Sequence, residues 1–113
     1  MSAAAELRAA AERLRELAED AHRASPAPWV VDPDWNLVRC ADRMVVVDRS
    51  GTDHPAERAD LAYIAVMHPG VALALAAVFE VWARMVDMDP DLLHRIGGEE
   101  TLAVARAIGG ETR

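Results

Sequence analysis

The sequence predicts an α+β fold with a long N-terminal helix, a small three-stranded antiparallel meander, and then two or three C-terminal helices. Residues 3–24 consist mostly of Ala, Leu, Glu and Arg, which are strong helix formers. Residues 29–48 contain three short apolar runs separated by turn-forming residues, which is typical of short strands. Residues 55–108 return to helical composition, with interruptions at proline and glycine. These observations predict the class and the order of its parts.

The length of the chain favours a single domain over residues 1–113, because 113 residues lie below the size at which chains usually divide. We expect its parts to be an N-terminal helix over 1–25, a small sheet over 29–48 and a helical part over 55–108. The single-domain interpretation also fits the sheet, since three short strands need a helix on their apolar face to be stable.

The N-terminal helix carries a narrow apolar stripe in which Leu7, Leu14 and Leu17 alternate with alanines at helical spacing. Such a stripe must be covered, either by the rest of the chain or by a second copy. In the second case these three leucines form the interface of a homodimer. Charged residues four positions apart are expected to pair along the outer face: Arg8 with Glu12, Arg15 with Glu19, and Glu19 with Arg23.

The predicted sheet follows the Ser25–Pro28 segment, where two prolines end the helix. We expect strands over 29–31, 35–40 and 44–47, with Trp35, Leu37 and Arg39 on one face of the second strand. Asp-rich and Arg-containing turns join the strands.

The helical part begins at Pro55, and His68-Pro69 either kinks this helix or breaks it. The following helix is expected to run to about Val86. A short helix over 90–96 should end at Gly97-Gly98, and a last helix should run from Thr101 to Ile108.

The charge of the chain excludes two classes of partner. Net charge is −7, and all 12 basic residues are Arg. An acidic chain lacks the basic face that binds nucleic acid through bulk charge, and it is repelled by anionic membrane surfaces. The most apolar run, 71–81, is too short to span a bilayer, and residues 1–24 lack the charge-then-apolar order of an export signal.

No catalytic or metal-binding pattern stands out. Residues 32–36 begin like a calcium loop, but its sixth and twelfth positions hold Leu37 and Arg43 where Gly and Glu are needed. The four His and the single Cys40 lack the close spacing of zinc ligands. Cys40 lies in a predicted strand, where a small apolar side chain packs well. We therefore expect no enzyme, no cofactor and no metal.

The remaining candidates form a binding surface of Trp29, Trp35, Arg39, Arg43 and Arg49 on and around the meander. Tryptophan is enriched where protein interfaces derive most of their affinity, although Trp also anchors the core of small sheets. Arginine binds anionic ligands and acidic partners, although arginines on a solvated face are equally ordinary.

Three stretches resemble a known group of proteins: Pro26-Ala27-Pro28-Trp29, the run from Ala59 to Leu73, and Leu102-Ala103-Val104-Ala105-Arg106. They are similar to motifs of small actinobacterial and actinophage accessory proteins, loosely akin to Ead/Ea22-like phage proteins. The resemblance implies a helix, a small sheet and further helices, with a phage or mobile-element origin and no catalytic residues.

These observations lead to two functional hypotheses. The first is a non-enzymatic accessory protein of a phage or mobile element, located in the cytoplasm of a bacterial host. It binds a host or phage protein, and this binding can act against a host function. The protein can also form a homodimer. The alternative is a protein that binds or sequesters a small anionic ligand such as a nucleotide, through Arg39, Arg43 and Arg49 beside the tryptophans.

Overall fold

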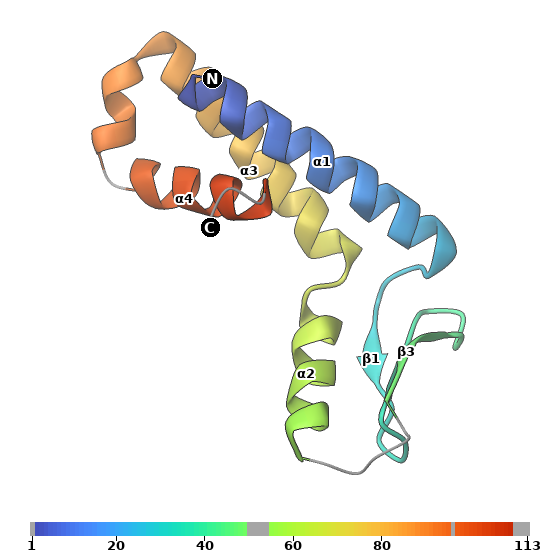
Figure 1. Ribbon diagram of the computed structural model, residues 1–113. Helices are drawn as coiled ribbons and strands as arrows, with labels where there is room; N and C mark the ends of the chain where they lie inside the picture. The colour runs from blue at the N-terminus through green and yellow to red at the C-terminus, as the bar shows by residue number, and fades with distance from the viewer. Residues whose placement is uncertain (1, 50–54, 96, 110–113) are drawn as a thin grey trace. The chain divides into compact units, whose positions relative to one another are not determined.

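The computed structural model describes residues 2–49, 55–95 and 97–109, and it confirms the predicted α+β class (Figure 1). A long helix precedes a three-stranded antiparallel sheet, and three helices and a 3₁₀ turn follow. The elements in chain order are α1 (Ala3–Ala24), β1 (Val30–Val31), β2 (Leu37–Arg39), β3 (Val45–Asp48), α2 (Pro55–Val66), α3 (Pro69–Met88), η1 (Pro90–His94) and α4 (Gly98–Ile108).

The chain divides into two compact units. Unit 1 comprises residues 1–16 and 73–113, and unit 2 comprises residues 17–72. The helices α1 and α3 each begin in one unit and end in the other. The expectation of a single domain stays a prediction, and each unit is described by itself.

Unit 1 has a core of small and large apolar residues from α1, α3 and α4. Leu7 and Phe79 are its largest fully buried side chains. Alanines of α1 and α3, such as Ala10 and Ala76, are buried in the same cluster. Burying a side chain as large as Leu or Phe contributes about 1.5–3 kcal/mol, so each of these two residues stabilises the unit substantially.

Ion pairs flank this core and correct one expectation from the sequence. The arginines of α1 do not pair with glutamates four positions along the same helix. The observed pairs are Arg8 with Asp87, Arg15 with Glu80, and Arg23 with Asp20. The first two pairs join α1 to α3, because the arginines stand beside the buried stripe and so lie near the neighbouring helix. All these side chains are substantially exposed, and water weakens such pairs.

The junction before α4 differs from the prediction. Gly97-Gly98 was expected to end a helix, but Gly98 is the first residue of α4, which therefore starts three residues before Thr101. Gly97 supplies the left-handed N-cap at φ 85°, a conformation that glycine adopts without steric cost. Gly98 is needed for close approach, since a Cβ there would lie 2.7 Å from the carbonyl oxygen of Leu93.

Unit 2 contains the sheet, in the order β1-β2-β3, and α2 packs against β1 and β2. Val31, Val38 and Val47 pair directly across the three strands and therefore share one face. Val38 is completely buried, as is Leu61 of α2. The predicted requirement for a helix on the sheet is thus met by α2. The first two strands are shorter than predicted, and both Trp29 and Trp35 lie outside them. The third strand has the predicted length but begins one residue later, at Val45.

The helical run breaks at His68 and does not merely kink. The helix α2 ends at Val66 and α3 begins at Pro69. Proline suits a first helical position because its missing N–H would have no partner there. The His68 Nδ1 atom accepts a hydrogen bond from the Gly70 N–H at 3.1 Å, which caps the new helix.

Among the described residues, no single helix has the length and apolar character needed to cross a membrane. Residues 58–66 and the helix Pro69–Met88 meet this criterion of length and composition only as a pair, and the chain bends by 50° at the break between them.

Candidate functional site

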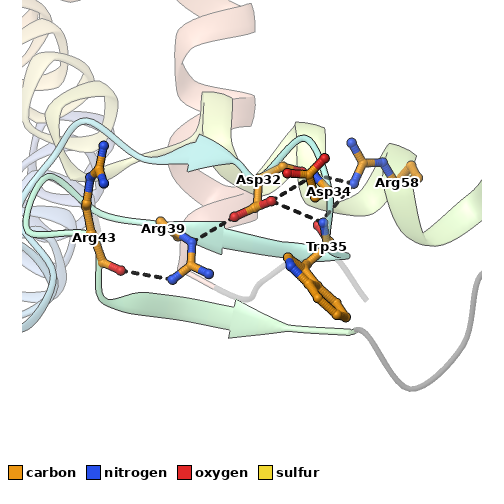
Figure 2. Close-up of polar contacts among 6 residues, drawn as sticks. All are labelled: Asp32, Asp34, Trp35, Arg39, Arg43 and Arg58. Atoms are coloured by element: carbon orange, nitrogen blue, oxygen red, sulfur yellow. Dashed lines mark hydrogen bonds and ion pairs between the residues drawn. The ribbon is translucent and has the colours of Figure 1, made fainter.

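The turn between β1 and β2, residues 32–36, is held by the Asp32 carboxylate (Figure 2). One carboxylate oxygen accepts hydrogen bonds from the N–H groups of Asp34 at 2.8 Å and Trp35 at 3.1 Å. The other accepts from Nε of Arg39 at 2.8 Å. The hydrogen bond from Arg39, and then the one from the Asp34 N–H, lower the pKa of Asp32 below its usual value. The aspartate therefore stays ionised and fixes the turn.

Arg58 of α2 holds the same turn from the other side (Figure 2). Its Nη1 atom lies within hydrogen-bond distance of the carbonyl oxygens of Asp32 at 3.2 Å and Trp35 at 3.1 Å, and of Asn36 Oδ1 at 3.2 Å. This nitrogen has two N–H groups and so shares them among three acceptors. Arg58 is not among the site residues predicted from the sequence, and the only signal there is that it is the sole basic residue of α2.

The two tryptophans near the sheet have different environments. Trp29 is half-buried, and its Nε1–H donates to the Ser25 carbonyl oxygen at 2.7 Å. It is therefore an internal anchor between the helix end and the sheet. Trp35 is 61% exposed, whereas Leu37 is buried. The expectation that Trp35 and Leu37 share one face of the strand is wrong, because the Asp32 turn takes Trp35 out of the strand.

The three candidate arginines are not equivalent. Arg39 pairs with Asp32 and also donates to the Arg43 carbonyl oxygen at 3.1 Å. Arg49 pairs with Asp60 at 2.7 Å. Within residues 2–49, 55–95 and 97–109, the Arg43 guanidinium has no hydrogen-bond or ion-pair partner. Arg43 also has a φ of 66°, a conformation that costs roughly 1–2 kcal/mol for a residue with a Cβ.

A hollow of about 650 Å³ lies beside β1 and the turns that flank the sheet. Its apolar lining includes Val30 and the prolines on either side of β1. Its charged lining consists of two carboxylates and two guanidinium groups, from Asp32, Asp34, Arg39 and Arg43. Cys40 also lines it but is only 6% exposed. The hollow therefore has no net formal charge.

The three leucines suggested for a dimer interface are separated by the fold. Leu7 is completely buried in the core of unit 1, and Leu14 packs against that core. Leu17 is 55% exposed. The first part of the stripe is thus covered by this chain, and the homodimer stays a prediction. A contact with a second copy through the stripe would have only Leu17 fully available.

Among the residues that the structure describes, no group of three His, Cys, Asp or Glu side chains is arranged to hold a metal ion. The residues of the calcium-like string instead form the Asp32 turn, in which one carboxylate already accepts backbone N–H groups and the Arg39 guanidinium.

Comparison with known proteins gives no relative to guide the assignment: no family description, curated protein or solved structure matches the chain. The resemblance to small phage accessory proteins therefore stays a prediction, and the candidate site rests on its own geometry.

Proposed function

We propose that this chain is a non-enzymatic accessory protein of a phage or mobile element that acts by binding a host or phage protein. The surface that makes this contact is the exposed side of unit 2 around the 32–36 turn. The observation that carries the proposal is Trp35, a large aromatic side chain that is 61% exposed on a turn fixed by its neighbours.

The rigidity of the turn supports this role. Asp32 holds the backbone of Trp35 from within the turn, and Arg58 holds its carbonyl oxygen from α2. Fixing a contact residue before binding lowers the entropy that association must overcome. An exposed Trp on a fixed backbone is thus well suited to be the residue from which an interface derives most of its affinity.

The wider surface of unit 2 also supports protein binding. Several large apolar side chains of this unit are exposed: Leu17, Val30, Trp35, Met44, Val45, Tyr63, Val66 and Met67. Aromatic and methionine side chains, such as Trp35, Tyr63 and Met44, belong to the types that are enriched in protein interfaces. On α2, Tyr63 and Val66 lie three positions apart and therefore on one side of the helix, outside its buried Leu61 face. Met67 follows directly after the helix and is also exposed.

The alternative, an anionic nucleotide bound by the arginines, has weaker support. Two of the three arginines already face carboxylates, Arg39 at Asp32 and Arg49 at Asp60. The hollow that Arg39 and Arg43 line also contains two aspartates. A multiply charged anion would meet as much negative as positive charge there.

Site-specific photo-crosslinking in the native host tests the proposal. Trp35 is replaced by p-benzoylphenylalanine, which keeps a large aromatic group at the exposed position. The matched control places the same group at Met88 of α3, a residue of unit 1 that is 86% exposed and lies outside the proposed surface. We expect a discrete covalent protein adduct from position 35 and none from position 88.

Competition makes the result specific. Excess unlabelled protein should suppress the adduct, and the Trp35→Ala protein should do so at least about thirtyfold less well, since the loss of such a residue costs about 2 kcal/mol or more. Equal suppression by both proteins, or no adduct from position 35, would contradict the proposal.

A further inference from the structure

The residues that line the hollow come from β1 and from the chain at both ends of this strand. Val30 pairs with Arg39, and the Ala41 N–H donates to the Pro26 carbonyl oxygen at 2.8 Å. The 40–43 turn therefore lies near the beginning of β1, and the 32–36 turn lies at its end. From Pro28 to Pro33, extended chain covers roughly 16 Å, which matches about five residues of an extended peptide.

The unpaired charges of the hollow lie at its opposite ends. Figure 2 shows Arg43 at one end of the strands and Asp34 at the other. Between them, Asp32 and Arg39 neutralise each other. Within the described part of the chain, neither the Arg43 guanidinium nor the Asp34 carboxylate has a side-chain partner. The hollow thus presents a positive end, a neutral middle and a negative end.

The middle of the hollow is apolar and is bordered by an edge strand. Val30 is 58% exposed and lines it together with Pro28, Pro33 and Ala41. β1 lies at one edge of the sheet, the position at which extended peptides add to proteins. The two prolines restrict ladder pairing to a short stretch, so the charges at the two ends must supply much of the selectivity.

The backbone of Arg43 is a second, independent indication. A non-glycine residue at φ 66° is strained, and glycine would relieve that strain. Here the position holds an arginine that lines the hollow. Its guanidinium makes no hydrogen bond or ion pair with any residue that the structure describes. A side chain kept at an unfavourable backbone position without an internal partner is consistent with an external one.

We propose that this hollow binds an extended segment of the partner protein, about five residues long, with an acidic side chain at Arg43, a basic side chain at Asp34 and small apolar residues between. The inference rests on the proposed function and specifies its partner. The lining charges sum to zero, which favours such a dipolar segment over a free anion.

The test uses the acetylated and amidated peptide Lys-Val-Ala-Val-Glu, followed by chemical shifts of the ¹⁵N-labelled full chain at millimolar peptide. We expect shifts at the amides of residues 30–34 and 39–43. Replacing Glu or Lys of the peptide by Gln should each weaken binding severalfold, in line with partly exposed ion pairs.

Double-mutant cycles assign the ends. The Glu→Gln peptide should lose affinity with the wild-type chain but not with Arg43→Gln, and the Lys→Gln peptide should lose affinity with the wild type but not with Asp34→Asn. The spectra of both variants show whether the fold is retained. The opposite combinations serve as controls: the Lys→Gln peptide with Arg43→Gln, and the Glu→Gln peptide with Asp34→Asn. Each should lose affinity as it does with the wild-type chain.

Three results would overturn the inference: no shifts with the peptide, equal binding by all peptides, or Arg43-dependent shifts with AMP or citrate but not with peptide. The last result would identify a small-anion site. A crosslink from position 35 that persists while the peptide experiments fail would remove this inference and leave the proposed function standing.

Discussion

Arg58→Ala tests whether the turn that presents Trp35 depends on α2. The substitution removes a charged donor that the Asp32 and Trp35 carbonyl oxygens and the Asn36 side chain share. Two N–H groups are lost, and hydrogen bonds from charged groups contribute about 1.5–3 kcal/mol each. The acceptors are only part-buried and regain water, so we expect the free energy of unfolding of unit 2 to fall by about 1–3 kcal/mol.

Two measurements check this expectation. Thermal unfolding followed by circular dichroism should show a lower Tm, by about 4–8 °C for each kcal/mol in a small domain. Amide hydrogen exchange should speed up at Asp34 and Trp35, whose N–H groups donate to the Asp32 carboxylate, because the turn opens more often.

The matched control is Arg43→Ala, which removes an arginine of the same unit whose guanidinium has no partner in the described part of the chain. We expect its stability to change by less than about 0.5 kcal/mol. If Arg58→Ala were as mild as this control, with exchange at the turn unchanged, then α2 would not hold the turn and the rigidity argument for Trp35 would fail.

The remaining predictions concern the core, a helix junction and pH. Leu7→Ala should lower the free energy of unfolding, measured in urea, by about 2–5 kcal/mol because the side chain is fully buried. Leu17→Ala, at an exposed position, should lower it by less than about 0.5 kcal/mol. Similar losses for the two variants would show that the stripe is not covered as described. Gly98→Ala should lower the stability of unit 1 by about 1–3 kcal/mol, because the added Cβ would lie 2.7 Å from backbone atoms. Gly109→Ala should be neutral or slightly stabilising, because the nearest atoms to its Cβ lie at 3.6 Å. A larger loss of stability for Gly109→Ala than for Gly98→Ala would refute the close approach at Gly98. The pKa of Asp32 is lower in the folded chain, so its stabilisation is complete above the unfolded pKa of about 3.9 and is lost as pH falls through the lower folded value. The free energy of unfolding of the wild-type chain should therefore fall at low pH, and that of the Asp32→Asn chain should lack this fall. Identical dependence of stability on pH in the two proteins would contradict the role of Asp32.

The binding surface shows where local pattern and tertiary contact diverge. From the sequence, Trp29 and Trp35 were equal candidates, and so were the three arginines. The structure shows an internal hydrogen bond for Trp29 and exposure for Trp35. It also shows carboxylate partners for Arg39 and Arg49. Residue type therefore predicts which side chains are candidates for binding. Only the tertiary contacts of each side chain show whether it is used inside the fold, as Trp29 is, or is exposed for a partner, as Trp35 is.

The sequence by itself determined the class and order of the elements, because helix propensity, apolar periodicity and the proline and glycine breaks act over a few neighbouring residues. It also determined the net charge of −7. Only the tertiary structure decided which part of the α1 stripe is covered, that Arg8 and Arg15 pair with α3, and that Arg58 reaches the turn. Those outcomes depend on residues far apart in the chain, and no local pattern encodes which of several equivalent partners comes within reach.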